Sequence, residues 1–103
     1  MRKRYILSPE AIDDLSEIWR YIAKQSGAAI ADQLEEEFFG TFDLLTQFPR
    51  AGHPRIDLTN RPVLFFPARK YMVIYQDTSD ELIVHAVLHS ARNLKRVLRR
   101  RKQ

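Results

Sequence analysis

The fold is decided by residues 71–89, which read YMVIY, QDTSDE and LIVHAVLH in order. Two strand-like runs are joined there by a polar turn at Asp77–Asp80, a pattern that predicts a β-hairpin. The second run is apolar at almost every position, and a strand of this kind is buried on both faces. It is therefore predicted to lie at the centre of a sheet.

The N-terminal half contains two helix patterns separated by a single glycine. Ser8 is a predicted N-cap, Pro9 suits the first helical position, and Gly27 ends the first helix. The predicted helices cover residues 9–26 and 28–47. So short a link forces them into an antiparallel hairpin. Their apolar residues recur at helical spacing, at Ala11, Leu15, Ile18, Trp19 and Ile22 and then at Ile30, Leu34, Phe38, Phe42 and Leu45.

The remaining elements complete an α+β fold in the order β-α-α-β-β-β-α. Strands are predicted at residues 4–7, 63–67, 71–77 and 81–89, and a loop at 49–62, which holds three prolines and a glycine. Ser90 is the predicted cap of a terminal helix. An antiparallel helical hairpin then covers one face of a small, mostly antiparallel sheet, while the terminal helix or another molecule covers the other. The predicted core includes Leu15, Trp19, Ile22, Leu34, Phe38, Val73, Tyr75, Val84 and Ala86.

Charge is unevenly spread along what we predict to be a single domain over residues 1–103. Residues 90–103 hold seven basic and no acidic side chains, whereas the rest of the chain holds 10 basic and 13 acidic ones. This basic C-terminal helix or tail suits a nucleic acid or an acidic protein patch, and the alternative is a segment that only aids solubility. The sequence contains no cysteine, and neither a signal peptide nor a membrane span is recognisable, so we expect a cytoplasmic protein.

Neither a metal site nor a cofactor site is predicted. His85 and His89 would lie about 13 Å apart along a strand, at about 3.3 Å per residue, which is too far to share an ion. Phosphate-binding loops and nucleophile elbows are absent from the sequence. The paired acids at Asp13–Asp14 and Glu35–Glu37 are interpreted as solvated charges on helix faces.

The order and spacing of several residue groups resemble the ParE branch of the ParE/RelE toxin superfamily. The groups are Leu7-Ser-x-x-Ala11-x-x-Asp14-Leu15-x-x-Ile18-Trp19-x-Tyr21-Ile22, then Phe48-Pro-x-x-Gly52-x-x-Arg55, Arg61, Tyr71-x-Val-x-Tyr75 and Val87-Leu-His89-x-x-Arg92. The resemblance covers about residues 4–98. It implies a RelE/ParE-like fold and a bacterial toxin of a type II toxin–antitoxin module, a class linked to plasmid stabilisation.

The superfamily has two activities, and the sequence lacks residues that one of them requires. RelE-like members cut messenger RNA in the ribosome with lysines and arginines on the sheet, whereas ParE-like members poison DNA gyrase. Residues 63–66 and Met72 are apolar where the RNA-cleaving relatives carry cations, and Leu98 lies near the position of their catalytic tyrosine. Only Arg92 matches a phosphate-binding arginine, and His89 is interpreted as a strand-end histidine bonded to the backbone. We therefore expect a gyrase poison without catalytic residues, and a ribosome-dependent ribonuclease is the alternative.

The resemblance also implies partners and the surfaces that meet them. A ParD-like antitoxin is expected to bind at Phe39, Phe42, Arg61, Arg69 and Arg92, with Phe39 reaching past the core. Its dimerisation would give a heterotetramer or larger complex, and operator DNA would be bound only through the antitoxin. Toxicity toward gyrase is expected at the C-terminal segment, at Arg92, Lys95, Arg96, Leu98 and Arg99. Removal of everything after Ser90 is expected to leave the hairpin and the sheet folded.

Overall fold

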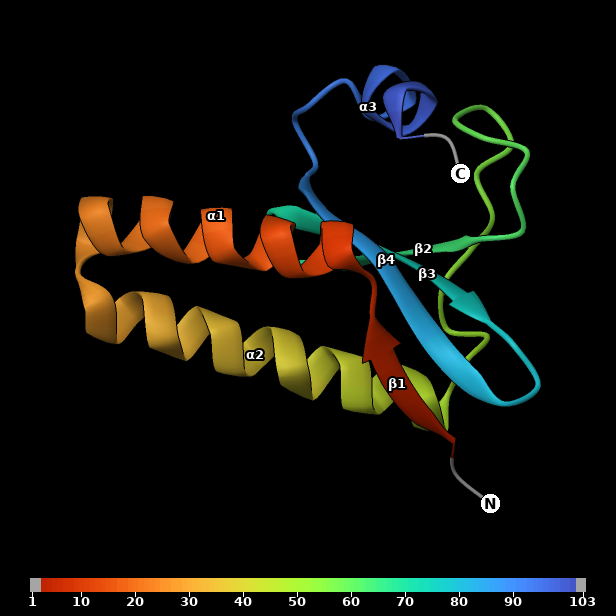
Figure 1. The fold of residues 1–103 in the computed structure, drawn as a ribbon, viewed down its shortest axis with the longest axis horizontal. Coiled ribbons are helices and arrows are strands. Elements are labelled where there is room, and N and C mark those ends of the chain that lie inside the picture. Colours follow the sequence, from red (N-terminus) through yellow and green to blue (C-terminus); the bar gives the residue numbers. More distant parts are fainter. Residues whose placement is uncertain (1–2, 102–103) are drawn as a thin grey trace.

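The computed structural model describes residues 3–101 and contains the seven predicted elements in the predicted order (Figure 1). The fold is α+β, as expected. The elements are β1 (Arg4–Leu7), α1 (Pro9–Ser26), α2 (Ala28–Gln47), β2 (Leu64–Ala68), β3 (Tyr71–Asp77), β4 (Glu81–His89) and α3 (Leu94–Arg100). Gly27 is the only residue between α1 and α2, and its φ of 98° lies in a region that glycine adopts readily. The two long helices therefore form the expected hairpin.

The strands form one sheet in the order β1-β4-β3-β2. The β2–β3 and β3–β4 pairs are antiparallel, and β1 lies parallel to β4. This arrangement confirms the prediction that the last strand is central and the sheet mostly antiparallel.

A β-bulge at His85 changes which residues of β4 face each side of the sheet. Tyr75 pairs with Val84 and Ile74 pairs with Ala86, so His85 is the extra residue on β4. Before the bulge, Leu82 and Val84 face the hairpin; after it, Val87 does. Residues 82–88 of β4 are apolar at almost every position because the strand is buried on both faces and because the bulge changes the face that each residue takes.

Each face of the sheet has its own core. The hairpin core contains Ala11, Leu15, Phe38, Phe42, Leu45, Tyr71, Val73, Tyr75, Leu82, Val84 and Val87. The rear core contains Val63, Phe65, Ile74, Ala86, Leu88, Leu94 and Leu98, so α3 covers part of the rear face. Most of the predicted core is confirmed, but Trp19 and Ile22 are only half-buried. Leu34 is also half-buried and packs against the hairpin core. The Trp19 indole N–H instead donates to Asp32 Oδ1 at 2.8 Å on the hairpin's outer side.

Ser8 and the first turns of α1 satisfy the edge of β4 beyond the end of β1, whose last pair is Leu7 with Val84. The Ser8 N–H donates to the Val84 carbonyl at 3.0 Å, and the Ser8 hydroxyl donates to the His85 carbonyl at 3.0 Å. The same hydroxyl accepts the Ala11 N–H at 3.1 Å and so caps the helix, as predicted. One turn further on, the Asp14 carboxylate accepts the Val87 N–H at 3.0 Å. The start of α1 is thereby fixed against the central strand.

The cap of α3 differs from the prediction. Asn93, not Ser90, caps this helix, and its side-chain oxygen accepts the Arg96 N–H at 3.1 Å. Ser90 is engaged elsewhere, because its N–H donates to the Lys70 carbonyl at 2.8 Å and extends the β3–β4 pairing. The helix therefore begins after a turn in which the Arg92 N–H donates to the His89 carbonyl.

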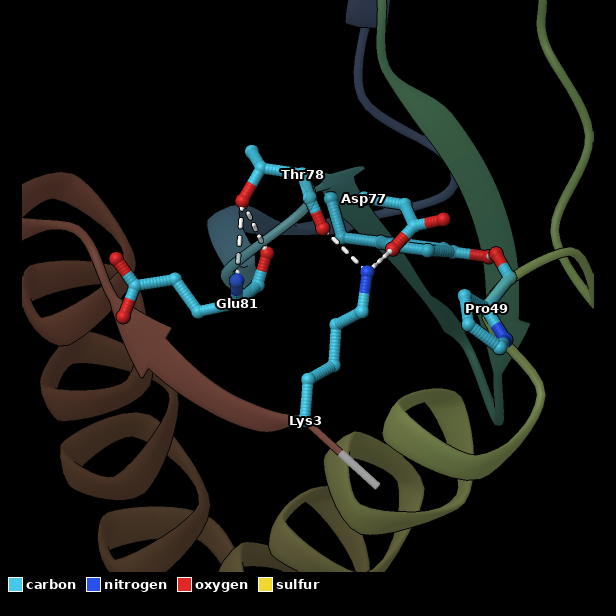
Figure 2. Close-up of polar contacts among 6 residues, drawn as sticks. Lys3, Pro49, Asp77, Thr78 and Glu81 are labelled. Carbon is cyan, nitrogen blue, oxygen red and sulfur yellow. Dashed lines mark hydrogen bonds and ion pairs between the residues drawn. The ribbon is translucent and has the colours of Figure 1, made fainter. Parts of the chain in front are cut away.

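The turn between β3 and β4 is tied to the start of the chain. Figure 2 shows the Lys3 ammonium group reaching both the Asp77 carboxylate and the Thr78 carbonyl oxygen. Within the turn, the Thr78 hydroxyl also accepts the Glu81 N–H at 3.1 Å. Across residues 3–101, no helix is both long enough and apolar enough to cross a bilayer.

Candidate functional site

A groove of about 510 Å³ follows the seam between α1 and α2, and we call it the hairpin groove. Its apolar members are Leu7, Ile12, Leu15, Trp19 and Phe39, and its polar members are Ser16, Arg20, Asp32 and Glu35. On α1, Ile12, Leu15 and Trp19 follow helical spacing, and on α2, Asp32, Glu35 and Phe39 do the same. An apolar floor with a polar rim is the form that accepts the apolar face of an amphipathic helix.

Only one of the two phenylalanines expected at an antitoxin surface reaches this groove. Phe39 is half-buried and lines it. Phe42 is fully buried, so we do not keep it among the proposed antitoxin contacts. The reason is the helical period, which turns Phe38 and Phe42 toward the sheet and leaves Phe39 one position to the side. The Phe42 ring meets Phe39 edge-on with centroids 6.1 Å apart and so supports the groove from below.

The three arginines expected at the antitoxin surface do not form one cluster. Arg61 precedes β2 and Arg69 follows it, so they lie at opposite ends of that strand. Arg61 is half-buried and contacts the Arg101 carbonyl at 3.5 Å, next to the end of α3. Arg69 makes two hydrogen bonds to Glu37 on α2; the Arg69 side chain is exposed and the Glu37 side chain is partly exposed. Arg92 shares the Arg69 end of the sheet, because Ser90 is bonded to Lys70 there.

The outer side of α3 forms a second candidate surface, which we call the α3 basic face. It consists of the exposed side chains of Arg92, Lys95, Arg96, Arg99 and Arg100. Four of the five residues expected at a toxicity surface are therefore exposed. The exception is Leu98, which is only 4% exposed and packs in the rear core. Leu94 and Leu98 are one turn apart and face the sheet, which turns the cations outward.

A buried carboxylate that the sequence interpretation missed holds the end of α3. Asp14 is 5% exposed, and its two oxygens bind the Arg101 guanidinium at 2.7 and 2.8 Å. Asp14 is therefore not a solvated helix charge, unlike the exposed Asp13. The spacing of Asp14 does indicate its burial, because it follows Ala11 by three residues and precedes Ile18 by four, on the buried side of the helix.

A mixed-charge cleft of about 370 Å³ lies between α1 and the end of β4. Lys70, His89 and Arg92 contribute to its lining, as do Asp14 and Glu17 on α1. His89 Nδ1 accepts the Ala91 N–H at 3.1 Å, and its ring meets Tyr71 edge-on, so His89 is bonded to the backbone as expected. Burial, and to a lesser extent nearby Tyr21, raises the pKa of Tyr71.

His85 lies under α3 on the rear side of the bulge. Its Nε2 is 3.0 Å from the Gln76 side-chain oxygen, and Glu10, Arg61 and Arg101 line the same small cavity. Burial and then the Arg61 charge lower the pKa of His85, against a smaller opposing effect of Glu10. Among residues 3–101, no group of three or more histidine, aspartate or glutamate side chains could hold a metal ion.

The sequence of the chain matches the model of a known protein family. A family model described as the ParE toxin of the type II toxin–antitoxin system parDE matches residues 5–94. Among solved structures, the chain is similar to one described as the chromosomal ParDE TA system from P. aeruginosa, with 13% identity and a TM-score of 0.73. That similarity covers 85% of this chain and 96% of the other, and at this identity it speaks for the fold. No curated protein matches the chain. Because the family model spans most of the sequence, the chain belongs to the ParE toxin family of type II toxin–antitoxin systems.

Proposed function

We propose that this toxin inhibits DNA gyrase, is neutralised by a ParD-like antitoxin and acts in the bacterial cytoplasm. One observation carries the choice of target. α3 covers part of the rear face of the sheet, where its Leu94 and Leu98 belong to one buried cluster with Phe65, Ile74 and Leu88. The cations of the segment point outward instead, onto the α3 basic face. The toxin therefore offers an outward-facing cationic helix surface where relatives that cleave RNA need cations on the sheet itself.

The same packing weighs against the ribonuclease alternative. Cleavage of RNA without a metal needs cations around the scissile phosphate to stabilise its developing charge. Val63 and Phe65 are buried in the rear core, while Leu64 and Phe66 pack against the hairpin core. Met72 is half-buried and packs against the rear core. These positions supply no cation. Among residues 3–101, the cations that line the cleft with His89 are Lys70 and Arg92, and Asp14 and Glu17 line it too.

The hairpin groove is the proposed antitoxin surface. Its apolar floor fits the apolar face of an antitoxin helix, and its Arg20, Asp32 and Glu35 fit polar residues at the helix flanks. Phe39 remains in the proposed contact set and Ile12 joins it, since Ile12 is 52% exposed in the groove. Antitoxin dimerisation would then produce a heterotetramer or larger complex that reaches operator DNA through the antitoxin.

The target is tested by adding the purified toxin to two reconstituted systems. In one, gyrase acts on plasmid DNA, and cleaved DNA held by gyrase is measured on a gel. In the other, ribosomes translate a labelled messenger, and messenger cleavage is measured. We expect cleaved DNA to accumulate and the messenger to stay intact. Messenger cleavage with unaffected gyrase would instead establish the ribonuclease alternative.

A further inference from the structure

We propose that the α3 basic face binds the phosphate backbone of double-stranded DNA, so that the toxin itself is a sequence-independent DNA-binding protein. The inference concerns the toxin alone and does not depend on gyrase being its target. It also differs from operator recognition, which we assign to the antitoxin. Three features of the molecule lead to it.

The first feature is a cationic surface with little to neutralise it. Arg92, Arg96 and Arg100 lie about one turn apart and line a shallow cleft of about 430 Å³ together with Asn93, Val97 and Arg101. Among residues 3–101, none of Arg92, Arg96, Arg99 and Arg100 forms an ion pair with an acidic side chain. The nearest acid of the adjoining loop, Asp57, is held by two hydrogen bonds from Arg55. Arg55, and to a smaller extent Lys95, lowers the pKa of Asp57.

The second feature is that this helix is held in place rather than left as a loose tail. Leu94 and Leu98 anchor one side of it in the rear core. Asp14 binds Arg101 at its C-terminal end, and the Arg101 carbonyl contacts Arg61 of the loop before β2. In Figure 1, α3 accordingly lies against the sheet and beside that loop, away from α2. The cations are therefore presented in a fixed array, which limits the entropy lost on binding.

The third feature is the kind of surface, which favours nucleic acid over an acidic protein. Four of the five side chains are arginines, whose planar guanidinium groups match phosphate oxygens. A protein interface needs apolar anchors at its centre, yet the apolar residues of α3 are buried or half-buried beneath the cations. The nearby exposed apolar residue, Ile56, belongs to the adjoining loop.

The charge of the whole molecule would orient it on a duplex. Residues 9–47, which contain α1 and α2, hold nine acidic and two basic side chains. The hairpin would be repelled from DNA while α3 is attracted, so the toxin would approach with α3 foremost. In that orientation the hairpin groove stays open, and antitoxin and DNA could be bound at the same time.

The test measures binding of the full-length toxin to a fluorescent duplex of arbitrary sequence over a range of salt concentrations. Each phosphate contact contributes about 0.9 to the slope of log affinity against log salt, so three to five contacts predict a slope of about −2.7 to −4.5. Arg96→Gln with Arg100→Gln should reduce that slope by about 1.8, because two contacts are lost. The matched control is Lys24→Gln with Arg50→Gln, which removes the same charge at exposed positions away from α3 and should leave the slope unchanged.

A second pair of variants and a second probe complete the test. Lys95→Gln with Arg99→Gln provides a second pair on the same face, and thermal unfolding verifies that every variant is folded. A polyglutamate chain replaces the duplex as a probe of acidic protein surfaces. The proposal is overturned if the toxin does not bind the duplex, if the control pair lowers the slope as much as the α3 pairs, or if polyglutamate binds more tightly than DNA.

Discussion

At the scale of single residues, one tyrosine hydroxyl organises the loop that follows α2. The Tyr75 hydroxyl donates to the Pro49 carbonyl at 2.8 Å and accepts the Gly52 N–H at 2.9 Å. Burial is the main reason that the pKa of Tyr75 is raised, so the hydroxyl keeps its proton. A methyl group on Gly52 would lie 2.7 Å from this oxygen and 2.9 Å from the Phe65 carbonyl oxygen. Glycine is needed there for close approach.

The first prediction compares two glycine-to-alanine substitutions. Gly52→Ala should destabilise the protein by about 1–3 kcal/mol, the usual effect of overpacking a filled site. Gly40→Ala should stabilise it by about 0.5–1 kcal/mol, because Gly40 lies inside α2 with open space around it. Urea unfolding measures both. Equal effects of the two substitutions would contradict the packing at Gly52.

The second prediction concerns pH and His85. Because the folded protein lowers the pKa of His85, the unfolded chain takes up a proton first as the pH falls below about 6.5. Stability from neutral His85 is therefore complete above that pH and is lost as the pH falls toward the folded-state pKa. His85→Gln should flatten the fall in unfolding free energy between about pH 7 and pH 5. The exposed His53, changed to glutamine, is the control. An unchanged pH dependence in His85→Gln would show that other groups cause it.

At the scale of elements, the contact between α1 and α3 joins the two sides of the sheet. Asp14 belongs to α1 in the hairpin layer, and Arg101 ends the helix that covers the rear core. Asp14 also receives a hydrogen bond from β4 at Val87. Leu94 and Leu98 bury the rear core, so removal of everything after Ser90 would expose it. The expectation that such a truncation leaves a folded protein is therefore revised, and surface substitutions are the better test of toxicity.

The third prediction uses neighbouring aspartates on α1. Asp14→Ala should cost about 1–3 kcal/mol, because it leaves the buried Val87 N–H without its acceptor. It should also release the end of α3 from Arg101 onward, so that proteases cleave the chain faster at sites C-terminal to Leu98. Asp13→Ala, at an exposed position one residue away, should stay within about 0.5 kcal/mol of the parent. Equal stabilities in thermal unfolding would rule out the Asp14 contact.

The elements whose ends are marked by their own residues were predictable from sequence. The bounds of α1 and α2 agree with the prediction because Ser8 and Gly27 mark three of their four ends chemically. The bulge at His85 was not predictable, because it depends on how β4 meets β3. The buried state of Leu98 and the cap at Asn93 depend on where the chain leaves the sheet. The hairpin groove brings together residues from three elements, and no single pattern contains it.

At the scale of the whole molecule, the two candidate surfaces are separate. The hairpin groove is built from β1, α1 and α2, and the α3 basic face follows β4. The acids are concentrated in the hairpin layer and the cations in the C-terminal segment. We therefore propose that different partners approach different sides of the toxin, so that neutralisation by antitoxin can be separated from target binding.

The fourth prediction tests this separation with two exposed isoleucines. Ile12→Glu places a charge in the hairpin groove and should weaken antitoxin binding at least tenfold, while gyrase inhibition persists. Ile30→Glu introduces the same charge on α2 outside the groove, where Ile30 is 48% exposed, and should change neither. Calorimetric titration with the cognate antitoxin measures the binding. Unchanged affinity in Ile12→Glu would place the antitoxin elsewhere.

If the α3 basic face carries the action on gyrase, reversing its charges should prevent cleaved DNA from accumulating. Cleaved plasmid DNA held by gyrase is quantified with the parent toxin, with Arg96→Glu plus Arg99→Glu, and with Lys24→Glu plus Arg50→Glu as the charge-matched control. Exposed charges are screened over about 8–10 Å at physiological salt, so the effect of the first pair should depend on salt. We expect the α3 pair to abolish trapping and the control pair to retain it. Full trapping by the α3 pair would show that another surface of the toxin acts on gyrase.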